Sequence, residues 1–136
     1  MKREELEKLA AEVVDAAFTV HNALGSGLLE SAYEMALCSE LKIRQIPFER
    51  QKAMPVHYRG MALDCGYRID LLVNGVIVIE LKAIEELAPI HEAQLFTYLK
   101  LTGCHLGFLI NFDVRLIKNG IKRIVCNLCE WGNDDV

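Results

Sequence analysis

The 136-residue sequence contains no apolar run long enough to cross a bilayer, and charged residues fill its first positions, where a signal peptide needs an apolar segment. We therefore expect a cytoplasmic protein that makes no contact with a membrane. The sequence also lacks repeats, linkers and low-complexity segments. Because its 52% hydrophobic and 25% charged residues are ordinary for a globular protein, we predict a single domain over residues 1–130 and a short tail over residues 131–136.

The cysteines are odd in number and scattered, which does not suit a disulfide framework. Two of them form the pair Cys126-Asn-Leu-Cys129, but a zinc site needs a second ligand pair, and Cys104 with His105 is the sole candidate. We expect reduced thiols and interpret the CxxC spacing as accidental. The five cysteines are Cys38, Cys65, Cys104, Cys126 and Cys129.

Positive charge is in short supply, because 15 Lys and Arg stand against 19 Asp and Glu, for a formal net charge of −4. Such a chain has no global attraction to a phosphate backbone, which counts against a dedicated nucleic-acid-binding protein. An enzyme with a local basic rim and a divalent metal is still compatible with this charge, since contacts are made by one face of the molecule. Candidates for backbone contacts are Lys42, Arg44, Arg50, Lys52, Arg68 and Lys100.

The order of the predicted elements indicates an α+β fold with a mixed sheet flanked by helices. Gly25-Ser26-Gly27 separates two helices, with Ser26 or Gly27 as the N-cap of the second. Three strands follow, and the third is apolar enough to be central. A helix then crosses to a fourth strand, which can lie parallel to the third. The predicted helices cover about residues 3–24, 28–44 and 89–102, and the strands about 48–58, 61–73, 76–83, 105–111 and 121–128.

Charged residues interrupt the apolar stretch from Arg68 to Lys82, which has the pattern of a β-hairpin around Asn74-Gly75. Asp70 lies in the first apolar run, and Glu80 and Lys82 close the second. Two carboxylates on adjacent strands can hold a hard divalent cation such as Mg²⁺ or Mn²⁺. Lys82 shares a strand face with Glu80, where it could orient the attacking water and neutralise charge at phosphorus.

This hypothesis depends on the turn of the hairpin. A two-residue loop at Asn74-Gly75 would place Asp70 and Glu80 on opposite faces of the sheet and destroy the site. If Val73-Asn74-Gly75 forms a three-residue loop with its glycine left-handed, Asp70 opposes Val78 and Glu80 becomes its diagonal neighbour on the same face. We predict that loop, or a bulge of one residue.

Each charged residue also has an ordinary structural interpretation. Asp70 and Glu80 could pair with Arg68 and Lys82 on a solvated face, an arrangement of little energetic weight. The aliphatic residues around Glu80 make this interpretation less comfortable, because they indicate burial on both faces of the strand.

Two helical motifs accompany the hairpin. Gly27-Leu-Leu-Glu30-Ser-Ala-Tyr33 opens the second helix, and His91, Gln94 and Tyr98 fall on one face of the third. Taken separately, Glu30 is a helix-capping acid at position N3, Tyr33 a core residue and Gln94 part of a solvated face.

Together these motifs resemble the GxxExxY family, which is assigned to the PD-(D/E)XK nuclease superfamily. The resemblance covers nearly the whole chain, although Ile69 stands where the superfamily name has proline, a position that varies. The motifs that carry it are Gly27-x-x-Glu30-x-x-Tyr33, Arg68-Ile-Asp70-Leu, Glu80-Leu-Lys82 and His91-x-x-Gln94-Leu-x-x-Tyr98-Leu.

The resemblance implies a restriction-endonuclease-like core with the order α-β-β-β-α-β. It also implies Mg²⁺-dependent cleavage of phosphodiester bonds in nucleic acid, with DNA favoured over RNA. By this resemblance Asp70 and Glu80 are the metal carboxylates, the backbone carbonyl of Leu81 adds a ligand, and Lys82 is the catalytic lysine.

Glu30 matches a first-helix acid that supports the metal through water, while Gln94 and Tyr98 match residues of the helix that follows the motif. A second hypothesis is a non-catalytic binding or assembly module that keeps the fold and uses an apolar patch to form a homodimer. The intact pair of acids with Lys82 argues against this second hypothesis, whereas the negative net charge and small size argue for it.

Overall fold

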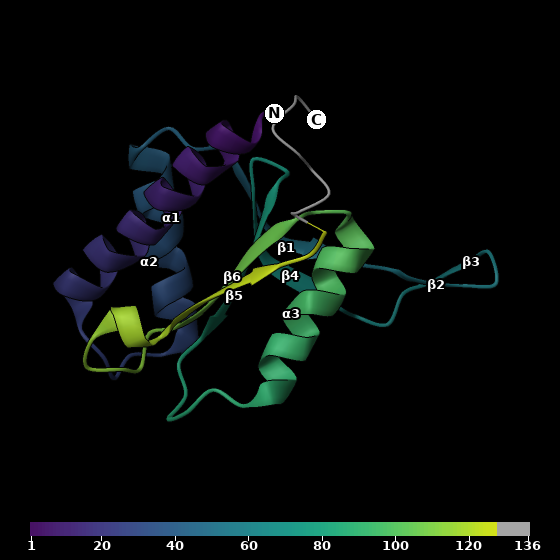
Figure 1. Cartoon of the computed structure of the whole chain (residues 1–136). Helices are drawn as coiled ribbons and strands as arrows, with labels where there is room; N and C mark the ends of the chain where they lie inside the picture. Colours follow the sequence, from purple (N-terminus) through teal and green to yellow (C-terminus); the bar gives the residue numbers. More distant parts are fainter. Residues whose placement is uncertain (128–136) are drawn as a thin grey trace.

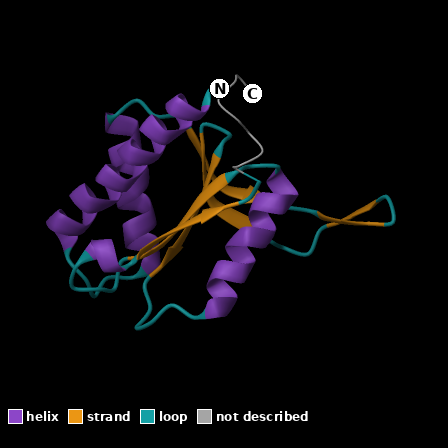
Figure 2. Cartoon of the chain, viewed as in Figure 1, coloured by secondary structure: helices purple, strands orange, loops and turns teal. Residues whose placement is uncertain are grey.

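The computed structural model describes residues 1–127 (Figures 1 and 2). A mixed five-stranded sheet lies between two helical layers, and a two-stranded hairpin stands apart from it. In chain order the elements are α1 (Arg3–Leu24), α2 (Glu30–Ile43), β1 (Phe48–Ala53), β2 (Val56–Tyr58), β3 (Met61–Leu63), β4 (Arg68–Val73), β5 (Ile77–Lys82), α3 (Pro89–Thr102), β6 (Leu106–Asn111), a short 3₁₀ helix (Ile117–Asn119) and β7 (Ile121–Val125).

The main sheet has the strand order β1-β4-β5-β6-β7, so β5 is central, as predicted. Strand β5 runs antiparallel to β4 and parallel to β6, and α3 forms the crossover between β5 and β6. Because helices cover both faces, every residue of β5 except Lys82 is buried. The predicted α+β fold class is therefore confirmed.

Two hydrophobic cores lie on opposite faces of the sheet, one under α1 and α2 and the other under α3 (Figure 1). Leu71 and Ile79 point into the first core, whereas Leu72 and Val78 pack with Leu95 in the second. Burial of each such side chain contributes roughly 1.5–3 kcal/mol. The alternation continues through Leu81 in β5, but in β4 it breaks at Asp70, because Ile69 packs in the second core and Leu71 in the first.

The strand predicted over residues 48–58 is two strands. Strand β1 ends at Ala53, and after Met54-Pro55 the chain enters β2, which pairs with β3 outside the main sheet. Pro55 has no N–H to donate, so it interrupts the ladder. The predicted turn at Arg59-Gly60 joins β2 to β3. The prediction of one strand over residues 61–73 is also wrong, because β3 and β4 lie in different sheets and separate at the predicted bend near Cys65-Gly66.

The helix ends follow the predictions except at the start of α2. Leu29, and not Ser26 or Gly27, is the N-cap residue, and no side chain caps this end. The predicted stop of α3 is confirmed, since Gly103 closes the helix in the left-handed conformation with a φ of 75°.

Strand β7 ends at Val125, short of the predicted residue 128. The end of the predicted domain, the predicted tail and Cys129 lie outside the described residues, so the interpretation of the CxxC pair stays a prediction. The four described cysteines are free thiols, as expected. Within residues 1–127, no helix is both long and apolar enough to span a membrane.

Candidate functional site

The turn between β4 and β5 holds one residue more than a two-residue hairpin. Asn74 and Gly75 have φ values of 50° and 69°, and the carbonyl of Val73 accepts a hydrogen bond from the N–H of Val76 at 3.0 Å. The first strand pair is Val73 with Ile77, so residues 74–76 form the loop. The predicted loop length and the left-handed Gly75 are confirmed, whereas the predicted loop residues are wrong by one position.

This register places Asp70 directly opposite Glu80 and not opposite Val78 as predicted. The last regular backbone pair is Leu71 with Ile79. Beyond it, the carboxylates of Asp70 and Glu80 accept the hydrogen bonds that link the two strands. The N–H of Asp70 donates to Oε1 of Glu80 at 3.2 Å, and the N–H of Leu81 donates to Oδ2 of Asp70 at 2.8 Å. The two carboxylates therefore meet at the gap between β4 and β5, and each is held by the backbone of the opposite strand.

Both carboxylates are withdrawn from solvent, since Glu80 is 6% exposed and Asp70 is half-buried. Burial, and then the charge of Asp70, raises the pKa of Glu80 to about 8, and burial also raises the pKa of Asp70. Neither acid takes part in a salt bridge among the described residues. The alternative in which they pair with Arg68 and Lys82 on a solvated face is therefore wrong.

Lys82 is half-buried and lies on the same face of β5 as Glu80. Its charge opposes, without cancelling, the rise in pKa of Glu80, Asp70 and Glu30. Within residues 1–127 it forms an ion pair with none of them. Its ammonium group is thus close to the carboxylates and available to a further negative charge.

Helix α2 brings Glu30 to the same end of the sheet. Glu30 is the first residue of the helix, so its interpretation as an N3 capping acid is wrong. Partial burial and the charge of Asp70 raise the pKa of Glu30, which locates its carboxylate near the pair on β4 and β5.

Tyr33 and Gly27 fix the connection between α1 and α2, which explains their place in the motif around Glu30. Its hydroxyl donates to the carbonyl of Gly25 at 2.6 Å and accepts the N–H of Leu28 at 3.1 Å. Gly27, at a φ of 99°, completes a backbone path that a residue with a side chain would follow only under strain. Tyr33 is buried, as its core interpretation predicts, and in addition clamps the connection that presents Glu30.

Helix α3 contributes Gln94 and Tyr98. Nε2 of Gln94 donates to the hydroxyl of Tyr98 at 3.1 Å, and burial, followed by the charge of Glu80, raises the pKa of Tyr98. The face that bears Gln94 thus points toward the carboxylates and is not merely solvated. His91 has a different task, because its Nδ1 accepts the N–H of Ala88 at 2.9 Å and caps the start of the helix.

Gln51, in the middle of β1, belongs to the site although the sequence pattern did not predict it. Its φ is 52°, a conformation uncommon for a residue other than glycine, and the register of β1 and β4 omits the pair it would form with Asp70. Its Nε2 donates to Oδ1 of Asp70 at 3.2 Å and to Oε1 of Glu34 at 2.7 Å. Glu34, also missed, is buried and pairs with Arg50 at 2.6 Å.

The sequence contains only a weak signal for the hydrogen bonds that join Asp70 to Glu34 through Gln51. The run from Glu49 to Lys52 places four polar residues in succession within a predicted strand, where alternation with apolar residues is the usual pattern. That run indicates an irregular strand with partners on both faces. It does not indicate that Gln51 joins Asp70 to Glu34.

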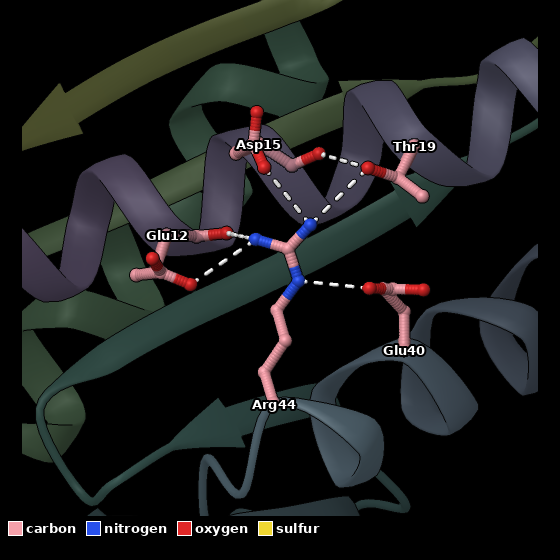
Figure 3. Close-up of polar contacts among 5 residues, drawn as sticks. All are labelled: Glu12, Asp15, Thr19, Glu40 and Arg44. Atoms are coloured by element: carbon pink, nitrogen blue, oxygen red, sulfur yellow. Dashed lines mark hydrogen bonds and ion pairs between the residues drawn. The ribbon is translucent and has the colours of Figure 1, made fainter.

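Arg44 bonds acids on α1 and α2 and forms no ion pair with Asp70 or Glu80. Its guanidinium group bonds Glu12 at 3.1 Å and Asp15 at 2.9 Å on α1, and Glu40 at 2.8 Å on α2 (Figure 3). It also donates to Thr19 at 3.1 Å. Arg44 therefore holds α1 against α2, and its contact with nucleic acid stays a prediction.

Three more of the basic candidates have partners. Arg50 pairs with Glu34, Lys52 with Glu49 at 2.8 Å, and the ammonium group of Lys100 lies 5.3 Å from the centre of the Phe96 ring. The last two candidates, Lys42 and Arg68, are exposed and form no ion pair within the described part of the chain.

No three His, Cys, Asp or Glu side chains of the described residues converge to enclose a metal ion. The donors at this end of the sheet are instead the oxygen atoms of Asp70 and Glu80. Mg²⁺ keeps several waters and is commonly held by one or two carboxylates, so this donor set fits Mg²⁺ or Mn²⁺ better than zinc.

Comparison with known protein families identifies one match. The family described as the PD-(D/E)XK nuclease superfamily matches residues 7–124, a range that extends from α1 into β7. No curated protein and no solved structure matched the chain.

Proposed function

The chain belongs to the PD-(D/E)XK nuclease superfamily, and we propose that it is a Mg²⁺-dependent nuclease that hydrolyses phosphodiester bonds of nucleic acid, with DNA favoured over RNA. One observation carries the proposal: the carboxylates of buried Glu80 and half-buried Asp70 lie together beside Lys82, with no salt bridge to any described residue. Burial of a negative charge is costly unless a proton or a cation offsets it, and a bound metal ion would take the place of the proton that Glu80 holds.

Asp70 and Glu80 would hold the ion, with the backbone carbonyl of Leu81 as a third ligand. The N–H of Leu81 donates to Asp70, and the N–H and carbonyl of one strand residue point to the same side. This carbonyl is therefore directed toward the gap between β4 and β5. When bound, Mg²⁺ would supply Lewis acidity at the phosphate and a water of lowered pKa.

The remaining residues act on the substrate and the water. Lys82 would contact a phosphate oxygen and stabilise the negative charge that develops as the bond to the leaving oxygen breaks. Glu30 would accept a hydrogen bond from water at the start of α2. Tyr98 holds the amide of Gln94, so Gln94 can orient water or a phosphate oxygen without a search among rotamers.

Within the superfamily, we place the chain in the GxxExxY family. The support is physical, because Gly27 and Tyr33 shape the connection from which Glu30 emerges. Gly27 and Tyr33 thus act together to position the carboxylate of Glu30 near Asp70.

A cleavage panel of single-stranded, double-stranded and flapped DNA and of RNA, with Mn²⁺ or Mg²⁺, tests the function. We expect cleavage by the wild type and its loss in Asp70→Ala, Glu80→Ala and Lys82→Ala. If all three variants cleave as fast as the wild type, the activity comes from a contaminant and the proposal is overturned. A thermal-shift titration with Mg²⁺ adds a second readout, in which the wild type gains stability and Glu80→Ala does not.

The same experiments separate the nuclease from a non-catalytic module. A module that only binds or assembles would give neither cleavage nor Mg²⁺-linked stabilisation. The matched control is Glu86→Ala, an exposed acid in the loop after β5, which is expected to behave as the wild type in both assays.

A further inference from the structure

Strands β2 and β3 form an arm (residues 56–63) that projects away from the two helical layers (Figure 1). Neither hydrophobic core contains a residue of the arm. An isolated two-stranded hairpin is marginally stable in water. Burial in a hydrophobic core therefore does not account for the arm, which suggests that its exposed surface serves in binding.

One face of the arm is apolar throughout. Val56 opposes Leu63 and Tyr58 opposes Met61, and opposed residues of a ladder share a face. Tyr58 is 60% exposed and Met61 is 63% exposed, so the apolar face is widest at the tip. Such a cluster on a narrow ribbon is typical of a contact surface and not of a packed core.

The base of the arm is tied to the candidate site. Tyr67 lies 6.3 Å from Tyr98, ring centre to ring centre, in an edge-on contact, and its carbonyl accepts the N–H of Met54 at 2.9 Å. Tyr98 in turn accepts the hydrogen bond from Gln94. Only Arg68 and Ile69 separate Tyr67 from Asp70 along the chain. The connection that follows the arm is thus joined to the candidate site through Tyr67 and Tyr98.

The charge of the arm is opposite to that of the whole chain. Residues 56–63 contain one Arg and no Asp or Glu, whereas acids outnumber bases in the full sequence. Arg59 lies at the tip, with its guanidinium carbon 5.6 Å from the centre of the Tyr58 ring, and Arg68 lies at the base. Neither arginine takes part in a salt bridge among the described residues.

We propose that the arm binds the nucleic-acid substrate beside the cleavage site, with Tyr58 and Met61 against bases and Arg59 and Arg68 on phosphates. The proposal rests on the proposed nuclease function. It also explains how a protein of net negative charge can bind a polyanion. A two-stranded ribbon has the width of the DNA major groove, and exposed apolar side chains can also wedge between bases. Exposed arginines at both ends of the arm favour a polyanion over a second copy of the same arm, since like charges repel.

Binding is measured by fluorescence anisotropy with short labelled DNA, as a duplex and as a single strand, in Ca²⁺ to suppress cleavage. For Tyr58→Ala we expect a loss of affinity of roughly tenfold, as for removal of one aromatic–base contact. For Arg59→Ala we expect the slope of log affinity against log salt to become shallower by about 0.9, the effect of one phosphate contact. Tyr58→Phe keeps the ring and is expected to bind as the wild type.

Two exposed residues outside the arm provide matched controls. Lys8→Ala removes a charge near the start of α1, and Ile43→Ala removes an apolar side chain at the end of α2. Both are expected to bind DNA as the wild type. Equal affinity of Tyr58→Ala, Arg59→Ala and the wild type would overturn the proposal, as would a dimer that Tyr58→Ala dissociates without any change in DNA affinity.

A small diester, bis(para-nitrophenyl) phosphate, separates this proposal from the nuclease function. The arm variants are expected to hydrolyse it with Mn²⁺ at the wild-type rate, because it does not reach the arm, while their cleavage of DNA falls. A wild type that hydrolyses neither substrate, with arm variants that still lose DNA affinity, would contradict the nuclease function and support the arm. Variants that bind and cleave DNA as the wild type does would overturn the arm and leave the nuclease function standing.

Discussion

Asp70 and Glu80 stand opposite each other on β4 and β5, and each carboxylate is tied to the backbone of the other strand. The bonds are 3.2 Å from the N–H of Asp70 to Glu80 and 2.8 Å from the N–H of Leu81 to Asp70. These bonds orient the oxygen atoms without any contribution from a ligand. A cation that binds there therefore meets donors whose conformational freedom is already restricted, which favours affinity.

Glu80→Gln is expected to change how stability depends on pH. The pKa of Glu80 is about 8 in the folded protein, against 4.5 as its ordinary value, so the folded state keeps a proton that the unfolded chain releases. Without metal, the free energy of unfolding should fall as pH rises through this window. Glu80→Gln should abolish that fall and be more stable above pH 8 by on the order of 2 kcal/mol.

Thermal denaturation in EDTA across this pH range measures the effect. Glu86→Gln is the matched control and should keep the wild-type profile, since Glu86 is exposed. In the wild type, Mg²⁺ must displace the proton, so Mg²⁺ affinity should rise with pH up to about 8. Parallel profiles for Glu80→Gln and the wild type would contradict the assignment of the proton to this site.

Lys82→Ala is expected to separate metal binding from catalysis. Removal of a positive charge near Asp70 and Glu80 should leave Mg²⁺ affinity unchanged or raise it, while cleavage falls roughly 10²–10³-fold, as for loss of one transition-state contact. Isothermal titration gives the first quantity and initial rates give the second. Lys100→Ala serves as the control, and a parallel loss of both quantities in Lys82→Ala would show that this lysine is structural.

Substitutions of Gln51 test whether backbone strain is stored beside the carboxylates. Gln51→Gly and Gln51→Ala both remove the amide that bonds Asp70 and Glu34, but glycine alone adopts a φ of 52° without penalty. The glycine variant should be more stable than the alanine variant by about 1 kcal/mol. Both should bind Mg²⁺ more weakly than the wild type, and to the same degree.

Urea unfolding and Mg²⁺ titration of the two variants measure these effects. Equal stability would argue that the conformation of Gln51 carries no strain. Mg²⁺ affinity as in the wild type would argue that Asp70 is positioned without this residue.

Arg44→Ala is expected to weaken the fold. The side chain is 17% exposed and bonds acids on both α1 and α2, so its loss should lower the free energy of unfolding by roughly 1–2 kcal/mol. High salt should narrow the difference from the wild type, because three of the contacts are ion pairs. Normal stability together with reduced DNA affinity would instead support Arg44 as a contact to nucleic acid.

Local patterns predicted most of the elements. The spacing of apolar residues located α1, the Pro89 and Gly103 signals located both ends of α3, and the apolar run through Ile79 identified the central strand. The strand predictions failed between Pro55 and Arg68, where the chain leaves one sheet and pairs within another. The chain leaves the main sheet at Pro55 and returns at Arg68, and the pattern of these residues does not show with which strand they pair.

The sequence by itself determined that Asp70 and Glu80 lie on the two strands of one hairpin and that Lys82 shares a face with Glu80, because turn chemistry at Asn74-Gly75 and the two-residue period of a strand are local properties. Only the tertiary structure decided that Asp70 opposes Glu80 directly, since a shift of the register by two residues keeps every side chain on its face. It also decided that Gln51 reaches Asp70 and that Arg44 bonds acids on α1 and α2. These contacts join segments far apart in the chain, and packing in three dimensions, not the neighbouring sequence, sets which of them meet.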